Sequence, residues 1–360
     1  MRLLFIASVV LALALGPKAT FAAEEEPAAT GSFSAAGLLA EARTAHTATL
    51  LRDGHVLVVG GSGLAPEEVW DPATASFGPA GSLAEARWLH TATALPDGRV
   101  LVVGGVGSDD HLASVEVWGP ATASFGPAGS LAEPRYIHTA TLLPDGRVLV
   151  VGGWHAEDVL ASAEVWDPAT ASFGPAGSLA EPRYGHTATA LPDGRVLVVG
   201  GGGWDLAEVW DPTTGSFGPA GSLAEARYDH TATLLPDGRV LVVGGWDGDG
   251  ALASAEVWDP ATASFGPAGS LAEARGKHTA TLLPDGRLLV IGGGGFDDVL
   301  ASAEVWDPAT ASFGPAGSLA EARGTHTATL LPDGRLLVIG GGDDDGNALA
   351  SAEVWTPNES

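Results

Sequence analysis

Short apolar runs separated by turn residues repeat along the chain from residue 31 onward, and none has helical periodicity. In residues 278–323, "HTATLL" predicts a strand, and the following "PDG" predicts a turn, because Pro fixes one φ and Gly accepts a positive one. "RLLVIGG" is nearly all apolar, which is typical of a strand covered on both faces. "SAEVWD" predicts a third strand, "PATA" a turn, and "SFGPAGSLAEAR" a fourth strand whose Gly and Pro suit an edge. One unit is therefore four antiparallel strands.

The unit recurs at a nearly constant period. The word "HTAT" occurs seven times, at spacings of 44, 48, 48, 44, 48 and 48 residues, and it begins at His46, His90, His138, His186, His230, His278 and His326. Periods of this length indicate a solenoid or a propeller. Four antiparallel strands per unit favour a propeller blade. The sequence therefore predicts an all-β fold, a seven-bladed β-propeller of four-stranded antiparallel blades.

The order of motifs resembles the kelch repeat. "R..H" is followed by an apolar strand ending in "GG", an aromatic before "DP.T", and a second aromatic. The Gly-Gly pairs carry the match, at Gly60-Gly61, Gly104-Gly105, Gly152-Gly153, Gly200-Gly201, Gly244-Gly245, Gly292-Gly293 and Gly340-Gly341. The family usually has Tyr before "DP" and Trp near the fourth strand, where this chain has Trp and Phe. The resemblance implies the propeller fold, which also forms the central domain of galactose oxidase, and says little about function.

The two ends of the repeat region complement each other. Residues 31–43, "GSFSAAGLLAEAR", read as a fourth strand with no preceding three, and the chain stops after "SAEVWTPNES", a third strand with no fourth. We expect the N-terminal strand to complete the last blade and close the ring, which removes exposed strand edges.

The first 22 residues have the layout of a secretory signal peptide: Arg2, an apolar run from Leu3 to Leu15, and small residues up to Ala22. An uncleaved anchor is the alternative, although the run is shorter than the roughly 20 residues that span a bilayer. We expect a signal peptide at 1–22, a flexible acidic lead-in at 23–30 and the propeller at 31–360. The mature protein is then secreted, either extracellular or periplasmic.

Net charge limits the classes of partner that the protein can bind, and the absence of cysteine limits how the fold is stabilised. The net charge is −27, and loss of Arg2 and Lys18 with the leader makes it −29. A surface with this much negative charge repels phosphate backbones and anionic lipids. We therefore expect no nucleic-acid partner and no membrane insertion after signal cleavage. There is no Cys, so packing must stabilise the fold without disulfides. We expect a monomer whose ligand is a protein or glycan, possibly basic.

Variation among the units is concentrated in two connections. The first is the pair between Arg and His: Thr44-Ala45, Trp88-Leu89, Tyr136-Ile137, Tyr184-Gly185, Tyr228-Asp229, Gly276-Lys277 and Gly324-Thr325. The second lies between "GG" and "EVW" and has 6, 10, 10, 6, 10, 10 and 11 residues in order. In an antiparallel blade, the strand 2 to 3 loop and the strand 4 to next strand 1 connection lie on one face. Diversification for binding and harmless drift both account for this; we favour binding, since rigid scaffolds commonly carry function on loops.

Composition supports a binding surface there. The eight aromatic residues outside the framework positions and the leader all fall in these two connections, together with many carboxylates. Aromatic rings supply contact area at low entropy cost, and carboxylates orient a ligand. The candidate binding residues are Trp88, Leu89, Tyr136, Ile137, Tyr184, Tyr228, Asp229, Lys277, Trp154, His155, Trp204, Asp205, Trp246, Asp247, Phe296, Asp297 and Asp298. As exposed loop residues, the four pair aromatics should be replaceable with little effect on stability.

Three chemical alternatives are weaker. The seven repeated His could bind metal near the axis, but a ring repeating with the fold is more often framework. "DGDG" at Asp247 and "DDDGN" at Asp343 lack the spacing and distal Glu of an EF-hand loop. The resemblance to galactose oxidase implies a copper centre with a tyrosine crosslinked to cysteine, and this chain has no Cys. We therefore expect a secreted recognition module with no catalytic residues, metal or cofactor. A carbohydrate-active or oxidase-like enzyme using the same face is the alternative.

Overall fold

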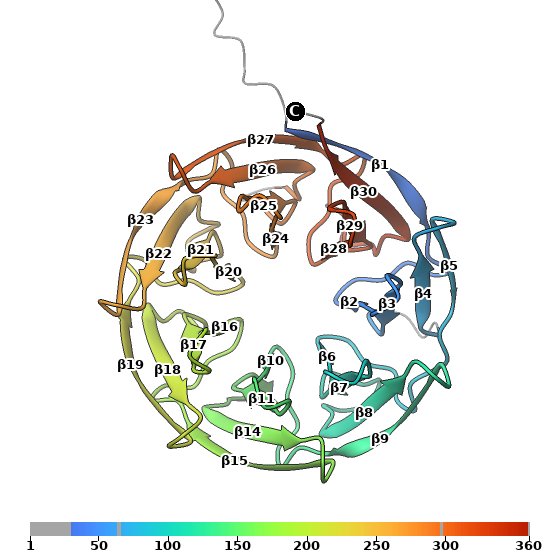
Figure 1. The fold of residues 1–360 in the computed structure, drawn as a ribbon, viewed down its shortest axis with the longest axis vertical. Helices are drawn as coiled ribbons and strands as arrows, with labels where there is room; N and C mark the ends of the chain where they lie inside the picture. The colour runs from blue at the N-terminus through green and yellow to red at the C-terminus, as the bar shows by residue number, and fades with distance from the viewer. Residues whose placement is uncertain (1–29, 63–65, 296–297, 359–360) are drawn as a thin grey trace, which may run out of the picture.

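The computed structural model describes residues 30–62, 66–295 and 298–358, and every regular element in these ranges is a strand. Figure 1 shows seven four-stranded antiparallel sheets arranged as blades around a central axis, with the first strand of each blade innermost. The seven-bladed propeller that the repeats predict is therefore confirmed. The expected signal peptide at 1–22 and nearly all of the lead-in lie outside the described residues.

The blades follow one another along the chain. Blade 1 contains β2 (Thr47–Leu50), β3 (Val56–Val59), β4 (Glu68–Asp71) and β5 (Ser76–Pro79), and blade 2 contains β6 (Thr91–Ala94), β7 (Val100–Val103), β8 (Ser114–Gly119) and β9 (Ser124–Ser130). Blade 3 contains β10 (Thr139–Leu142), β11 (Val148–Val151), β14 (Ser162–Asp167) and β15 (Ser172–Ser178), with a small hairpin of β12 (Trp154–His155) and β13 (Asp158–Val159). Blade 4 contains β16 (Thr187–Ala190), β17 (Val196–Val199), β18 (Leu206–Asp211) and β19 (Ser216–Ser222).

The remaining blades repeat this order. Blade 5 contains β20 (Thr231–Leu234), β21 (Val240–Val243), β22 (Ser254–Asp259) and β23 (Ser264–Ser270), and blade 6 contains β24 (Thr279–Leu282), β25 (Leu288–Ile291), β26 (Ser302–Asp307) and β27 (Ser312–Ser318). Blade 7 contains β28 (Thr327–Leu330), β29 (Leu336–Ile339), β30 (Ser351–Pro357) and, from the other end of the chain, β1 (Gly31–Leu38).

Closure of the ring by the N-terminal strand is confirmed. β1 pairs antiparallel with β30, with Phe33 opposite Trp355 and a register shift between Ala35 and Leu38. In Figure 1 the blue β1 and the dark red β30 lie side by side at the outer rim. The fourth strands are shorter than the sequence predicts: β5 ends at Pro79, those of blades 2 to 6 end at the Ser of "GPAGS", and the following "LAEAR" or "LAEPR" is a connection.

The second strand of each blade forms the core. All four residues of β3 are fully buried: Val56 and Val58 pack toward Leu337 and Ile339 of blade 7, whereas Leu57 and Val59 pack toward blade 2. Alternate side chains of a strand point to opposite faces, so one apolar run serves two interfaces between blades. This is why the run reads as continuously apolar in the sequence.

Polar contacts tie each blade to its neighbour. The indole Nε1 of Trp118 on β8 donates to the carbonyl of Ala80 in blade 1 at 3.0 Å, and the other six framework Trp make the equivalent bond. A buried Trp needs such an acceptor for its N–H. None of the described residues forms a helix long and apolar enough to span a bilayer.

Candidate functional site on the loop face

The two variable connections lie side by side, as predicted. Bridges join Trp88 to Val106 in blade 2 and Tyr136 to Trp154 in blade 3, and in each case the first residue of the pair lies opposite the residue that follows Gly-Gly. Blade 5 has the same bridge between Tyr228 and Trp246. We call the side of the ring that carries these connections the loop face. The side that carries the "PDG" and "DPAT" turns is the turn face.

A buried ion pair fixes the connections of the loop face to the blade. In blade 2, Nη2 of Arg87 donates to Oε1 of Glu116 at 2.8 Å, and Nη1 donates to the carbonyls of Gly104 and Ser114. Arg87 is completely buried, and burial lowers its pKa while Glu116 opposes that shift. Every blade repeats the pair between this Arg and the Glu of "EVW". The partner Glu was not among the residues predicted from the sequence, although its presence in all seven copies of "EVW" could have indicated a structural role.

The second residue of each variable pair forms a closed ring of backbone hydrogen bonds. Each one donates its N–H to the carbonyl of the equivalent residue in the preceding blade, from 2.8 Å for Asp229 to Gly185 up to 3.5 Å for Gly185 to Ile137. All seven have positive φ, although only Gly185 is a glycine. Their side chains therefore stand on a rigid ring around the axis, in the order Ala45, Leu89, Ile137, Gly185, Asp229, Lys277 and Thr325.

The repeated histidines are framework residues. Nε2 of His90 lies 2.9 Å from Oγ1 of Thr47 in the preceding blade, and all seven make this contact. Burial, with a contribution from the nearby Arg87 charge, lowers the pKa of His90 to about 3, so the ring is neutral. Among the described residues, no three His, Cys, Asp or Glu side chains come together in a metal-binding arrangement. A framework role is what the sequence predicts for these histidines, and the hydrogen bond between blades is that role.

The Gly-Gly pairs allow this close contact between blades. Gly104 has a φ of 59°, and a Cβ there would lie 2.5 Å from the carbonyl oxygen of Arg135 in the next connection. Both the backbone conformation and the space exclude a side chain.

Aromatic rings form a continuous band across blades 2 to 5. The centroid of Tyr136 lies 4.7 Å from that of His111 and 6.4 Å from that of Trp154, with the Trp154 and Tyr136 planes only 9° apart. Trp154 contacts Tyr184 at 4.5 Å, and Tyr184 contacts Tyr228 at 6.3 Å. We call these five residues the aromatic band. His111 was not among the predicted residues, because nothing in its own connection shows that it lies against a Tyr of the next blade.

The expectation that the pair aromatics are exposed is wrong. Trp88, Tyr136, Tyr184 and Tyr228 are all of intermediate burial, and the three Tyr rings each pack against a ring from another connection. Replacing them will therefore affect stability as well as any ligand. Among the predicted aromatics in the described residues, Trp204 is the one that is exposed, at 37%.

Blades 6 and 7 differ from the aromatic side of the face. The indole of Trp246 lies over Gly276, where an added Cβ would be 2.0 Å from Nε1, so the small residue in blade 6 makes room for the ring. The loop face is thus asymmetric, with rings gathered over blades 2 to 5 and Gly276, Gly324 and Thr44 at the first pair position elsewhere.

Small hairpins form in the longer connections of the loop face. The longer connections fold back on themselves in blades 2, 3, 5, 6 and 7, through β12 and β13 or through single bridges such as Trp246 to Ala251. Blade 4 has a connection of only six residues and lacks a bridge of this kind in the described structure, which leaves Trp204 and Leu206 exposed. Blade 4 thus lies without such a hairpin between the hairpins of blades 3 and 5, and the connection of blade 1 is equally short.

Asp229 lies on the floor of the face beside its ring partners. Its Oδ1 would be 2.8 Å from a Cβ built on Gly185, and its Oδ2 is 3.9 Å from Nζ of Lys277. Burial raises the pKa of Asp229, and Lys277 only partly opposes that shift. Burial raises the pKa of Tyr228, and the charges of Asp229 and Asp247 add to that shift, so both carboxylates lie within electrostatic range of Tyr228.

The predicted residues thus fall into three groups. The ring carries Leu89, Ile137, Asp229 and Lys277, the aromatic band carries Tyr136, Trp154, Tyr184 and Tyr228, and the surrounding connections carry Trp88, His155, Trp204, Asp205, Trp246, Asp247 and Asp298. Phe296 and Asp297 lie outside the described residues.

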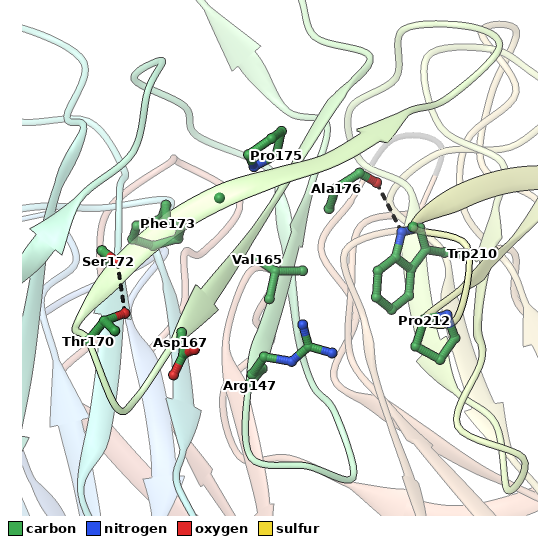
Figure 2. A pocket seen from close by; sticks show the side chains of 12 residues that line it. Arg147, Val165, Asp167, Thr170, Ser172, Phe173, Pro175, Ala176, Trp210 and Pro212 are labelled. Carbon is green, nitrogen blue, oxygen red and sulfur yellow. Dashed lines mark hydrogen bonds between the residues drawn. The ribbon is translucent and has the colours of Figure 1, made fainter.

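Cavities occur on both sides of the ring. A cavity of about 220 Å³ at the mouth of the central channel is lined by His46, His90, His138 and His326 with Ala45, Leu89, Ile137 and Thr325. A groove of about 330 Å³ lies between blades 3 and 4 on the turn face, where Figure 2 shows Arg147 beside Val165 and near Trp210. Blade 4 has a similar groove of about 270 Å³ lined by Arg195 and Phe217. Because these grooves are lined by residues common to most blades, we assign them to the framework.

Comparison with known proteins agrees with this architecture. The Kelch motif matches residues 227–267, which run from Arg227, just before the variable pair Tyr228-Asp229, to the outer strand β23 of blade 5. The protein is therefore a seven-bladed β-propeller that contains a kelch motif. A fungal alcohol oxidase of the AA5 family, solved in complex with copper, has a similar fold with a TM-score of 0.75 at 19% identity, over 88% of this chain and 74% of its own. No curated protein matches the chain.

The ring histidines and His111 each have a polar partner already. Each ring His already contacts a Thr through Nε2, and Nδ1 of His111, beside Tyr136, accepts the N–H of Ala156 at 2.9 Å. In the described part of the chain, no group of three His, Cys, Asp or Glu side chains comes together around any of these histidines.

Proposed function

We propose that this protein is a recognition module whose loop face binds a protein or carbohydrate ligand. The kelch propeller supplies a rigid scaffold, and the ring of backbone hydrogen bonds holds the variable side chains in fixed positions. The observation that carries the proposal is the aromatic band: five rings from three variable pairs and two loops contact one another across blades 2 to 5. Aromatic residues held in this way form effective contact surfaces.

The test is an array of glycans and peptides probed with the protein and with a Tyr136→Ala/Tyr184→Ala double variant. We expect the variant to lose any ligand that the parent captures, because interface aromatics each contribute roughly 2 kcal/mol or more. A matched change on the turn face, Thr170→Ala, should leave capture unchanged. Equal losses from both variants would place the binding surface elsewhere.

We also propose that the role is binding rather than catalysis, because the chain has no Cys and the ring histidines are engaged between blades. Protein incubated with copper should then give no alcohol oxidation above free metal. Peroxide production that saturates with substrate and is lost in a His111→Ala variant would contradict this. Export from the cell remains a prediction from residues 1–22.

A further inference from the structure

We propose that the ligand of the loop face is an extended cationic polypeptide segment, anchored by a basic side chain beside Asp229 and leaving the ring over blade 4. This inference rests on the recognition function proposed above and names the class of ligand. It is carried by the distribution of charge, the anchor at Asp229 and the short connection of blade 4, which lies next to that anchor.

Cations are almost absent from the loop face. Of the 17 Lys and Arg residues, two lie in residues 1–22, seven are the buried Arg of the Arg–Glu pairs, and seven are in the turns of the turn face. Lys277 is the one that remains. Besides the Glu of each "LAEAR" or "LAEPR" segment, the two variable connections carry the acidic residues Glu67, Asp109, Asp110, Glu157, Asp158, Asp205, Asp229, Asp247, Asp249, Asp297, Asp298, Asp343, Asp344 and Asp345.

The turn face is different, because it carries seven Arg residues and its "PDG" carboxylates in blades 2 to 7 each pair with one of them. Arg99 binds Asp97 at 2.7 Å, and the same pair recurs in blades 3 to 7. The loop face, which carries the aromatic band, thus has fewer cations to balance its carboxylates than the turn face has. A potential of this kind attracts cations and repels anionic ligands.

Asp229 is the carboxylate best placed to anchor a ligand. Its side chain is only 22% exposed, yet its one ion pair, to Lys277, is long at 3.9 Å, and Lys277 itself is 55% exposed and free to swing away. Tyr228 and Tyr184 lie next to it, with ring centroids 6.3 Å apart. A guanidinium or ammonium group placed here would meet a poorly paired carboxylate and two aromatic faces, the combination that favours Arg and Lys.

The path from the anchor leads over blade 4. Gly185 gives no side chain to the ring between Asp229 and Ile137, and beyond it lie Tyr184 and the exposed Trp204. The ring N–H groups are already bonded to carbonyls of the ring, so the ligand must bind through side chains rather than by adding a strand. Basic side chains with apolar stems suit this floor of Tyr and Trp rings.

The experiment measures binding of a ten-residue peptide of alternating lysine and alanine by calorimetry, at about 50 mM and about 300 mM salt. The glutamate-alanine peptide of the same length and a neutral maltohexaose serve as comparison probes. We expect the lysine peptide alone to bind, with affinity falling at the higher salt concentration, where exposed charges are screened within about 5 to 6 Å.

Three variants separate the anchor from a general charge effect. Asp229→Asn should weaken the lysine peptide about tenfold, because it removes the anchoring charge, and Asn tolerates the positive φ of this position. Lys277→Gln should tighten binding, which a merely structural role would not produce. Asp259→Asn makes the same charge change on the turn face of blade 5 and should alter affinity less than about twofold.

Failure of this inference is distinct from failure of the proposed function. The inference is overturned if the parent does not bind the lysine peptide, if maltohexaose binds instead, or if Asp229→Asn and Asp259→Asn have equal effects. The recognition function survives those results if the array still finds a ligand that the Tyr136→Ala/Tyr184→Ala variant loses.

Discussion

Backbone strain at single residues fixes the geometry of the loop face. Ile137 and Thr325 are β-branched and adopt φ values of 51° and 53°, a conformation that costs roughly 1–2 kcal/mol for a residue with a Cβ. The ring of N–H to carbonyl bonds holds them there. Because backbone hydrogen bonds rather than side chains hold this conformation, the ring positions can carry different side chains. This explains why Leu, Asp and Lys replace one another among the blades.

Relieving this strain should stabilise the protein. Thr325→Gly is expected to raise the free energy of unfolding by about 0.5–1 kcal/mol, after the entropy cost of Gly is subtracted. Urea unfolding monitored by tryptophan fluorescence measures the change. Thr310→Gly, at a turn-face residue without positive φ, should be destabilising instead. A loss of stability from both variants would show that the ring position is unstrained.

The buried Arg–Glu pair makes a larger contribution. Glu164→Ala leaves the guanidinium of the fully buried Arg135 without its carboxylate, and breaking such a pair costs roughly 3–5 kcal/mol. The same urea experiment tests this. Glu133→Ala is the control, since Glu133 is half exposed and lies 4.0 Å from the same Arg. A loss below about 1 kcal/mol for Glu164→Ala would contradict the assigned role.

Side-chain contacts between blades were the least predictable feature of the site. The sequence placed the eight extra aromatics on one face, because loop position follows from strand count. It did not show that Tyr136 meets His111 or that Trp246 lies over Gly276, since those contacts depend on the spacing and twist of neighbouring blades. It also predicted exposure where ring stacking produces half-burial.

At the scale of strands, the sequence was sufficient for the architecture. The fully apolar second strand, the Gly-Gly pair and the "PDG" and "DPAT" turns each predict one element of a blade. Because the same pattern recurs in seven units, each prediction is made seven times. Strand ends were less predictable, because "LAEAR" continues the sequence pattern of the fourth strand. In the structure it is a connection whose Arg is held by the buried pair with Glu.

The closing strand gives a prediction at this scale. A chain that starts at residue 39 lacks β1, so β30 loses its partner, and Trp70 Nε1 loses the carbonyl of Ala36. We expect aggregation or a marked fall in melting temperature, because an unpaired strand edge is exposed. A chain that starts at residue 30 keeps β1 and should melt like the parent. Equal melting of the two chains would contradict closure by β1.

The whole ring should be sensitive to acid through its seven histidines. Burial lowers the pKa of His46, His90, His186, His278 and His326 to about 3, and of His138 and His230 well below 6.5. The unfolded chain takes up these protons first, so the stabilisation is complete above pH 6.5 and is lost as pH falls toward 3. Each histidine contributes a loss of about 1.4 kcal/mol per pH unit in that window.

Circular dichroism against pH measures this loss, and we expect cooperative unfolding between about pH 6 and pH 4. In urea titrations at a series of pH values, His138→Gln should reduce the pH dependence of the free energy of unfolding. Stability that stays constant from pH 7 to pH 4 would show that the ring histidines are not held neutral.

The central claim is that the propeller is a framework on which one face recognises a ligand. Hydrogen–deuterium exchange of the protein with and without its array-selected ligand tests it most directly, because the two faces fall in different peptides of every blade. The account predicts protection in the connections around residues 136–137, 184–185, 228–229 and 246–252, with no change in the "PDG" and "DPAT" turns. Protection confined to those turns, or spread equally over both faces, would contradict it.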